Sequence, residues 1–414
     1  MIERRATRAT LLFATLLCLA IPAARAADDV SAIVADRVYV SPEREPLAHA
    51  TVVVTNGKIS AVGPSAEVAI PPGARVVRGN GMTLTAGFWN SHVHFIEPRF
   101  QDAAKRPAAE LEAALRDMLT SRGFVHAFEI ANFQIENTLA MRERIERGEV
   151  KGPSILTVGV PFVPPNGGPG YLPEHSFPEI ADPATARAFV AKQIAAGADG
   201  IKFWSESPTR HGVVPMPIDV AKAAVEAAHA AGKPVFAHPT NNRGVRIAAE
   251  SGVDVLAHTS PEGFEPWSDE FVAMLKSRGM AITPTLKLFR WDPERQEVPA
   301  PIVQRLMKTT EEQLRKYSDA GGTILFGTDV GYITDYDTAE EFAAMGRAGM
   351  NAAKILASLT TAPARKFGAA SRTGTIAPGM DADLVLLGDD PRTDVKAFTD
   401  VRLAMRRGVV LFEK

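Results

Sequence analysis

Two histidines separated by one residue, His92 and His94, lie at the end of a segment with the pattern of a β-strand, Leu84–His94. Side chains two residues apart point to the same side of a strand. A neutral imidazole is a common ligand of transition metals, so the pair suits a metal site at a strand end. Two exposed histidines on an ordinary strand have the same pattern, so the pair alone does not decide the matter.

Other residues that can bind or bridge metal ions lie at the ends of later strand-like segments. Four of the nine histidines of the chain occur at strand ends, together with one lysine and one aspartate. A random distribution of polar residues would not place them there repeatedly. Beyond the first pair, these residues are Lys202, His238, His258 and Asp329.

Strand and helix patterns alternate through the middle of the chain, and glycines follow several helices, where a left-handed cap is favoured. Eight such units predict an α/β fold, a (β/α)₈ TIM barrel of typically ~250 residues, over residues 84–370. An open doubly wound sheet is the alternative, but that fold usually has a glycine-rich turn after its first strand, where this chain has histidines. The predicted strands are 84–94, 123–130, 154–160, 200–204, 234–238, 253–258, 280–286 and 323–329.

The barrel interpretation explains why the six residues belong together. In such a barrel the C-terminal ends of the strands form the rim of the active site. We therefore expect all six side chains to converge on one rim.

Strand patterns without intervening helices occur on both sides of this region, in residues 27–83 and 371–414. The Asn56-Gly57 pair lies between two of these segments and is a strong hairpin signal. The simplest arrangement is one small β-sandwich domain built from both ends of the chain.

The first 26 residues have the pattern of a secretory signal peptide. Arginines at the start precede an apolar run, Leu11–Ile21, and the small residues of Ala24-Arg25-Ala26 suit cleavage after Ala26. The run is short for a transmembrane helix, although an uncleaved membrane anchor is the alternative. We therefore expect a secreted or periplasmic protein without stable membrane insertion. The only cysteine, Cys18, lies in this segment, so the mature chain would bind metal through histidine, carboxylate or lysine chemistry.

The six residues resemble the pattern of the metal-dependent amidohydrolase superfamily, which has H-x-H on strand one, lysine on four, histidines on five and six, and aspartate on eight. The segments Gly57-Lys58-Ile59, Gly374–Gly379 and Ala382-Asp383-Leu384 also look like this family. The chain looks most like its prolidase-like and imidazolonepropionase-like branch of secreted members. It departs at Asn90, where many relatives carry an acid, and at Ala86, where they often have proline.

The resemblance implies a binuclear metal centre. The histidines of strand one and Asp329 would hold one divalent ion, and those of strands five and six would hold the other. A CO₂-derived carbamate on Lys202 would bridge them, a hydroxide between the ions would be the nucleophile, and Asp329 would pass its proton to the leaving group. Zn²⁺ is the first choice for histidine and carboxylate ligands. An unmodified Lys202 in a one-metal site, or Asp329 as a helix N-cap, are the alternatives.

The chain has 46 Lys and Arg against 48 Asp and Glu, so it lacks the basic excess of nucleic-acid-binding proteins. Aromatic residues after several strands suit a hydrophobic acyl group, and Arg210, Arg243 or Arg290 would bind a substrate carboxylate. We predict hydrolysis of an amide bond in a small molecule or short peptide, either a dipeptide or an N-acyl amino acid. The candidate substrate-binding residues are Tyr171, Trp204, Arg210, His211, Arg243 and Tyr332.

Several alternatives to this function stay open at this point. A cyclic amide, imidazolone, lactone or other ester would use the same metal site with a different pocket. A one-metal deaminase would leave the strand-four lysine without its bridging role. A secreted scaffold or binding protein would keep the barrel but not the chemistry. The sequence also leaves a homo-oligomer open.

Overall fold

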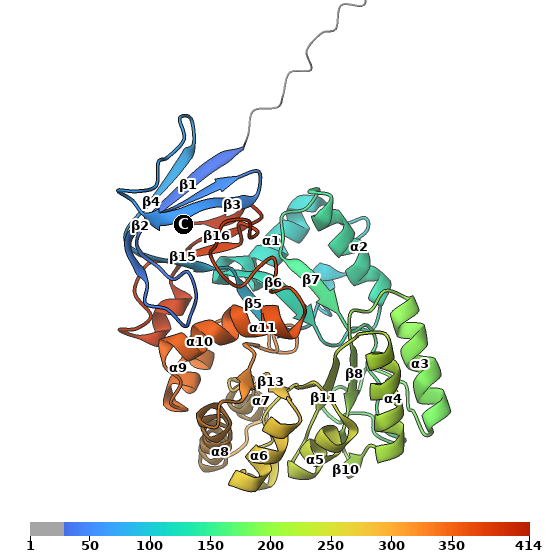
Figure 1. Cartoon of the computed structure of the whole chain (residues 1–414). Helices are drawn as coiled ribbons and strands as arrows, with labels where there is room; N and C mark the ends of the chain where they lie inside the picture. The colour runs from blue at the N-terminus through green and yellow to red at the C-terminus, as the bar shows by residue number, and fades with distance from the viewer. Residues whose placement is uncertain (1–28) are drawn as a thin grey trace, which may run out of the picture.

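The computed structural model describes residues 29–414 (Figure 1). The predicted signal peptide lies outside these residues and stays a prediction. Within the described part of the chain, none of the helices combines the length and apolar character needed to cross a membrane.

Strands from both ends of the chain form one sheet. β4 (Arg75–Ala86) is its central strand, since it pairs in parallel with β1 and antiparallel with β15. The predicted Asn56-Gly57 turn joins β2 to β3, and both residues have positive φ, as a tight hairpin requires. The strand order is β17-β16-β15-β4-β1-β2-β3, with β1 Val30–Val38, β2 Leu47–Thr55, β3 Lys58–Pro64, β15 Leu384–Leu387, β16 Val401–Arg406 and β17 Val409–Glu413.

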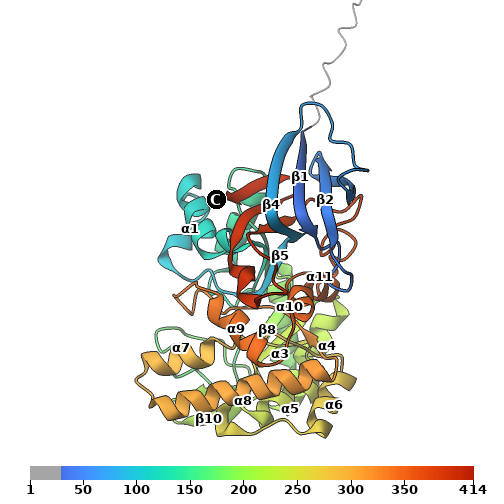
Figure 2. The same ribbon diagram turned by 90° about the vertical axis from the view of Figure 1, so that its left-hand side faces the viewer.

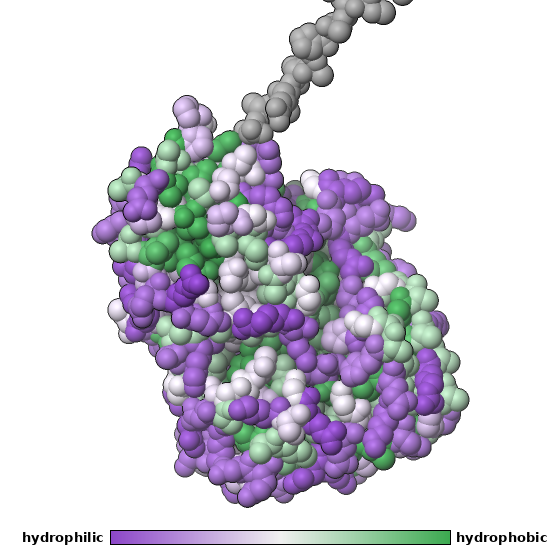
Figure 3. Space-filling view, viewed as in Figure 1, coloured by the Kyte–Doolittle hydropathy of each residue, from purple (hydrophilic) through white to green (hydrophobic). Residues whose placement is uncertain are grey.

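This terminal sheet does not confirm the predicted β-sandwich. A sandwich needs two sheets packed face to face, whereas the seven strands are hydrogen-bonded into a single sheet. Apolar side chains from both chain ends still share one core, which includes Ile33, Val52, Leu84 and Leu386. On the face shown in Figure 3, hydrophobic residues gather over this sheet, whereas the surface of the helices is mostly polar.

The predicted strand 84–94 is two strands that meet at Gly87. Residues before the glycine complete β4, and residues after it form β5 (Phe88–Val93). The Gly87 N–H donates to the Asp383 carbonyl at 2.8 Å, and a Cβ at this position would lie 2.3 Å from Cγ2 of Val125. The chain thus passes directly from the terminal sheet into the layer that carries the histidines.

Eight parallel strands follow one another in sequence order, but they form two sheets. β5, β6 and β7 make a three-stranded sheet, and β8, β11, β12, β13 and β14 make a five-stranded sheet. Isolated β-bridges join the two sheets: Val93 pairs with Val330, and Phe162 pairs with Phe203. The predicted barrel is therefore an α/β arrangement of two bridged sheets and not one continuous ladder. The bounds are β6 Phe124–Glu129, β7 Ser154–Thr157, β8 Ile201–Trp204, β11 Val235–His238, β12 Val255–Leu256, β13 Ala281–Ile282 and β14 Thr323–Ile324.

Helices surround these strands (Figure 1) and bury their apolar faces against them, so that one large core contains residues of both. The sequence pattern did not predict α7, which contains Pro293, or the hairpin β9–β10; α7 lies alongside α8 in Figure 2. The α-helices are α1 Ala108–Met118, α2 Ile135–Glu146, α3 Pro183–Ala195, α4 Ile218–Ala230, α5 Asn242–Ser251, α6 Asp269–Ser277, α7 Leu288–Arg295, α8 Ala300–Asp319, α9 Ala339–Arg347, α10 Ala352–Leu359 and α11 Thr361–Lys366. The hairpin is β9 Glu206–Thr209 and β10 Gly212–Pro215, and short 3₁₀ turns lie at η1 Pro98–Phe100, η2 Thr120–Arg122, η3 Glu262–Phe264 and η4 Val395–Thr399.

Candidate active site

The first part of the site joins the end of β5 to the segment after β14. Nε2 of His92 and Nε2 of His94 lie 3.1 Å and 2.9 Å from Oδ1 of Asp329. The Asp329 backbone has a left-handed φ of 60°, and its N–H donates to the His92 carbonyl at 2.9 Å. A side chain at Gly331 is excluded, since its Cβ would lie 1.9 Å from the His94 carbonyl oxygen. This tight turn holds the carboxylate against both imidazoles.

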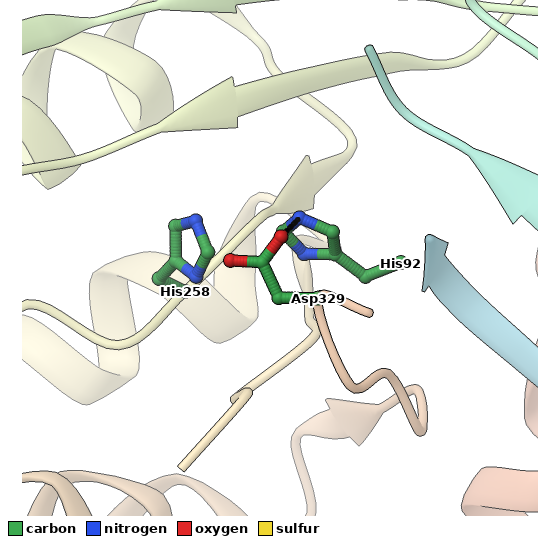
Figure 4. A group of neighbouring side chains, drawn as sticks. All are labelled: His92, His258 and Asp329. Atoms are coloured by element: carbon green, nitrogen blue, oxygen red, sulfur yellow. Dashed lines mark ion pairs between the residues drawn. The ribbon is translucent and has the colours of Figure 1, made fainter. Parts of the chain in front are cut away.

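The second part of the site lies beside the first. The His258 ring centroid is 4.8 Å from the centroids of both His92 and His238. The ligand atoms of His92, His258 and Asp329 all lie within 4.8 Å of one another, and Figure 4 shows these three side chains converging from separate elements. Nδ1 of His258 is 2.6 Å from the Thr285 hydroxyl, which fixes the orientation of the ring.

Lys202 completes the group from β8. Its side chain is almost fully buried, and its ammonium nitrogen lies 5.3 Å from the ring centroid of Trp204. Within residues 29–414, Lys202 has no hydrogen bond or ion pair through its amine. A buried amine without such a partner is costly in its charged form.

Burial sets the protonation states of the group. It lowers the pKa of His92 to about 4 and holds those of His238 and His258 well below their ordinary value. Burial also lowers the pKa of Lys202 to about 7. Burial alone would raise the pKa of Asp329, but His92 and His94 together outweigh it and hold that pKa well below its usual range. The site therefore presents neutral imidazoles, a carboxylate and a readily deprotonated amine.

These residues fit a divalent metal ion. The His94 Nδ1–H donates to the Ala131 carbonyl at 2.9 Å, which leaves the Nε2 lone pair available as a ligand. Nδ1 of His92 is buried and finds no hydrogen-bond partner in the described part of the chain. Neutral histidines with a carboxylate are a donor set that zinc and related ions accept.

Asn90, which departs from the family pattern, connects the two parts of the chain that carry the first ligands. Its Nδ2 donates to the Thr328 hydroxyl at 2.7 Å. Its Oδ1 accepts from the N–H groups of His92 and Thr328 at 3.3 Å and 3.2 Å. His92 is a predicted ligand and Thr328 directly precedes the predicted ligand Asp329, so Asn90 is a positioning residue for the site.

A cavity of about 750 Å³ opens above the group. Five of the six predicted ligands line it, and His92 lies beneath, in contact with Asp329. Of the six candidate substrate residues, four also line the cavity: Tyr171, Trp204, Arg210 and Tyr332.

The other two candidates, His211 and Arg243, do not line the cavity. His211 is exposed in the turn between β9 and β10. Arg243 forms an ion pair with the buried carboxylate of Glu206, so its guanidinium is already engaged. Their positions after predicted strands did not show that these two side chains point away from the cavity.

The cavity wall combines aromatic, aliphatic and polar side chains. The Trp204 indole N–H donates to the Tyr171 hydroxyl at 3.1 Å, and the Tyr332 hydroxyl donates to Asp292 at 2.9 Å. Arg295, on α7, and Glu262, on η3, also line the cavity. Neither was predicted, because the sequence indicated no structure in these segments.

Comparison with known proteins identifies the family. The model of the Amidohydrolase family matches residues 83–411. The chain belongs to the Amidohydrolase family. The predicted resemblance to this family is therefore confirmed.

Two relatives of known sequence align with different shares of this chain. Ochratoxinase of Aspergillus niger is 24% identical over 414 residues, which cover 88% of this chain and 82% of that protein. An uncharacterised protein of Mycobacterium tuberculosis is 27% identical over 244 residues, covering 56% of this chain and 62% of that protein. This chain thus spans less than two thirds of the length of the mycobacterial protein.

Solved structures share the fold. A Xaa-Pro dipeptidase with bound methionine superposes with a TM-score of 0.79 at 21% identity, covering 93% of this chain and 100% of that chain. A prolidase-like protein from Bifidobacterium longum superposes with a TM-score of 0.76 at 24% identity, covering 92% and 94%.

Proposed function

We propose that this amidohydrolase is a metal-dependent enzyme that cleaves the C–N bond of a dipeptide or an N-acyl amino acid. The observation that carries the proposal is the convergence of the predicted ligands at the base of one large cavity. Similarity to a dipeptidase and to ochratoxinase supports this class of bond without identifying the substrate.

The donor set suits two divalent ions, of which zinc is our first choice. The histidines of β5 and Asp329 would hold one ion, and His238 and His258 would hold the other. Lys202 would join them as a carbamate, formed when its neutral amine attacks CO₂ and releases a proton. The buried, unpaired amine with a lowered pKa favours this reaction, because only the neutral amine is nucleophilic. When bound, the ions would supply Lewis acidity for the amide carbonyl and lower the pKa of water.

Asp329 is the group that moves the proton. Its carboxylate stays ionised next to the two imidazoles, so it can accept a proton from the attacking water at a carboxylate oxygen. It then delivers the proton to the leaving amine nitrogen. Tyr171, Trp204 and Tyr332 line the cavity beside it.

Arg210 is the group we assign to the substrate carboxylate. Among the three arginines predicted for this role, it alone lines the cavity. Arg243 is paired with Glu206, and Arg290 lies 3.2 Å from both Glu294 and Glu340. A guanidinium can bind a carboxylate through two parallel hydrogen bonds.

The test is a hydrolysis screen of dipeptides, N-acyl amino acids, cyclic amides, lactones and esters, read by mass spectrometry of the products. We expect cleavage of linear amides with a free carboxylate, and a loss of about 10²- to 10⁴-fold in kcat for Asp329→Asn. Asp319→Asn, an exposed change on α8, is the matched control and should retain activity. Cleavage of cyclic amides or esters alone would contradict the proposed substrate class.

A further inference from the structure

One wall of the cavity is built by α7, by the first turns of α8 and by the segment between them. Figure 2 shows the two helices side by side. The proposed reaction uses no residue of this wall. Most of the side chains that the wall presents to the cavity are apolar: Leu288, Phe289, Pro293, Val298, Ile302 and Leu306.

The protein itself covers these apolar side chains only in part. None of the eight residues of α7 is buried, and Ile302 on α8 keeps 43% of its surface exposed. Ile302 and Leu306 are four residues apart, so they lie on one face of α8, and both line the cavity. Apolar surface that lines a cavity and stays open to water is stabilised when an apolar ligand covers it.

The polar groups of this wall are paired with one another. Asp292 accepts hydrogen bonds from the Tyr332 hydroxyl at 2.9 Å and from Gln296 Nε2 at 2.6 Å. It also forms an ion pair with Arg295 at 3.2 Å, and the Arg295 guanidinium lies over the Trp291 ring, 4.6 Å from its centroid. These groups need no charged ligand, so the surface that a ligand would cover on this wall is the apolar part.

The apolar wall begins beside the predicted metal centre. The ring centroid of Phe289 lies 6.3 Å from that of His258. Arg210, which we assign to the substrate carboxylate, follows β9 and so comes from a different element. The cavity volume of about 750 Å³ lies within the range of sites for drug-sized ligands, ~300–1,000 Å³. A substrate whose amide lies at the metal centre therefore has room to extend an apolar group along α7 and α8.

We propose that α7 and the start of α8 form an acyl-chain subsite, and that the substrate is an N-acyl amino acid with a medium-length or long aliphatic chain. The chain covers the apolar wall from Phe289 towards Ile302, while Arg210 binds the carboxylate of the amino acid. A dipeptide fits less well, because its ammonium group takes the place of the first carbons of that chain, against side chains that offer it no partner. The inference rests on the proposed function for the reaction, and it narrows the two substrate classes given there to one.

Binding of straight-chain fatty acids to the zinc-loaded wild-type enzyme tests the subsite without turnover. These acids are the acyl products of the proposed reaction and have no amide bond to cleave. Isothermal titration calorimetry would compare butanoate, hexanoate, octanoate and decanoate. We expect the affinity to rise about two- to fourfold for each added CH₂ group that the wall covers. An affinity that does not depend on chain length overturns the subsite.

Ile302→Ser is the decisive variant, because this side chain is exposed and its replacement leaves the core intact. The affinity for decanoate should fall by about 3- to 10-fold, whereas the affinity for butanoate, whose chain is short, should match that of wild type. Ile218→Ser is the matched control, since Ile218 is 36% exposed at the start of α4 and does not line the cavity; it should leave both affinities unchanged. An unchanged affinity for decanoate in Ile302→Ser, or an equal loss for both acids, overturns the subsite.

Other occupants of the wall, and failure of the reaction, give different results. If Ile302→Ser lowers the molar mass measured by light scattering and leaves decanoate binding unchanged, the wall is a contact between two copies of the chain and the subsite fails. If the chain-length dependence holds but no amide is cleaved, the subsite stands and the proposed reaction fails. If N-acetyl and N-decanoyl amino acids are cleaved with equal KM, the reaction stands and the subsite fails.

Discussion

Replacing Lys202 by methionine should stabilise the metal-free protein in a pH-dependent way. Burial lowers the pKa of this amine from 10.5 to about 7 in the folded chain. Below pH 7 the amine is charged in both the folded and unfolded states, so the wild-type protein carries the whole cost of burying the charge. Between pH 7 and 10.5 only the unfolded state binds the proton, so stability rises with pH and the cost declines; above 10.5 it is gone.

The size of the effect follows from the same pKa. At about 1.4 kcal/mol per pH unit, the cost is about 5 kcal/mol at pH 6 and about 2 kcal/mol at pH 9. Lys202→Met removes it, so the difference in unfolding free energy between variant and wild type should narrow by about 3 kcal/mol from pH 6 to pH 9. Any change in hydrophobic burial adds a constant that does not depend on pH.

The assay is urea unfolding of chelator-treated protein in CO₂-free buffer, which prevents carbamate formation. Lys222→Met, an exposed change on α4, is the matched control and should show no narrowing. A difference that is the same at pH 6 and pH 9 would refute the argument that Lys202 is a buried and unpaired amine.

Three further outcomes are expected. Burial raises the pKa of Glu341 to about 7, above its unfolded value, so wild-type stability falls as pH rises from about 4.5 to 7. The unfolding free energy of Glu341→Gln, measured relative to wild type by urea unfolding, should therefore be about 2–3 kcal/mol higher at pH 8 than at pH 5. The same relative value at both pH values would contradict this. Asn90→Ala removes three buried hydrogen bonds and should lower the unfolding free energy by about 2–4 kcal/mol. It should also weaken metal affinity by about 10- to 100-fold. Unchanged affinity in a chelator competition would show that Asn90 does not position the ligands. Arg210→Ala should raise KM about tenfold for substrates with a carboxylate, whereas Arg290→Ala should not; equal KM values in both variants would exclude Arg210 as the carboxylate contact.

The strand-end residues could be predicted because topology brings them together. Each strand pattern is local in sequence, and parallel strands in register place their C-terminal ends on one rim. His92, His258 and Asp329 therefore meet although 237 positions of the sequence separate the first from the last. The resemblance to a known family then supplied the role of each residue.

Features that depend on side-chain direction or on distant pairing could not be predicted in this way. Arg243 follows β11 as expected, but the buried carboxylate of Glu206 holds it away from the cavity. The single terminal sheet depends on β4 pairing with β15 some three hundred residues later, and no local pattern encodes that contact. Arg295 lies on α7, where Pro293 obscured the helix.

The paired metal centre joined by Lys202 is the central claim, and metal content per chain tests it most directly. Protein purified without chelators would be measured by elemental analysis, wild type beside Lys202→Ala. The account predicts about two divalent ions per wild-type chain and a clear loss of metal when Lys202 is removed. One ion per chain that is indifferent to Lys202, or no metal even after zinc is added, would contradict it.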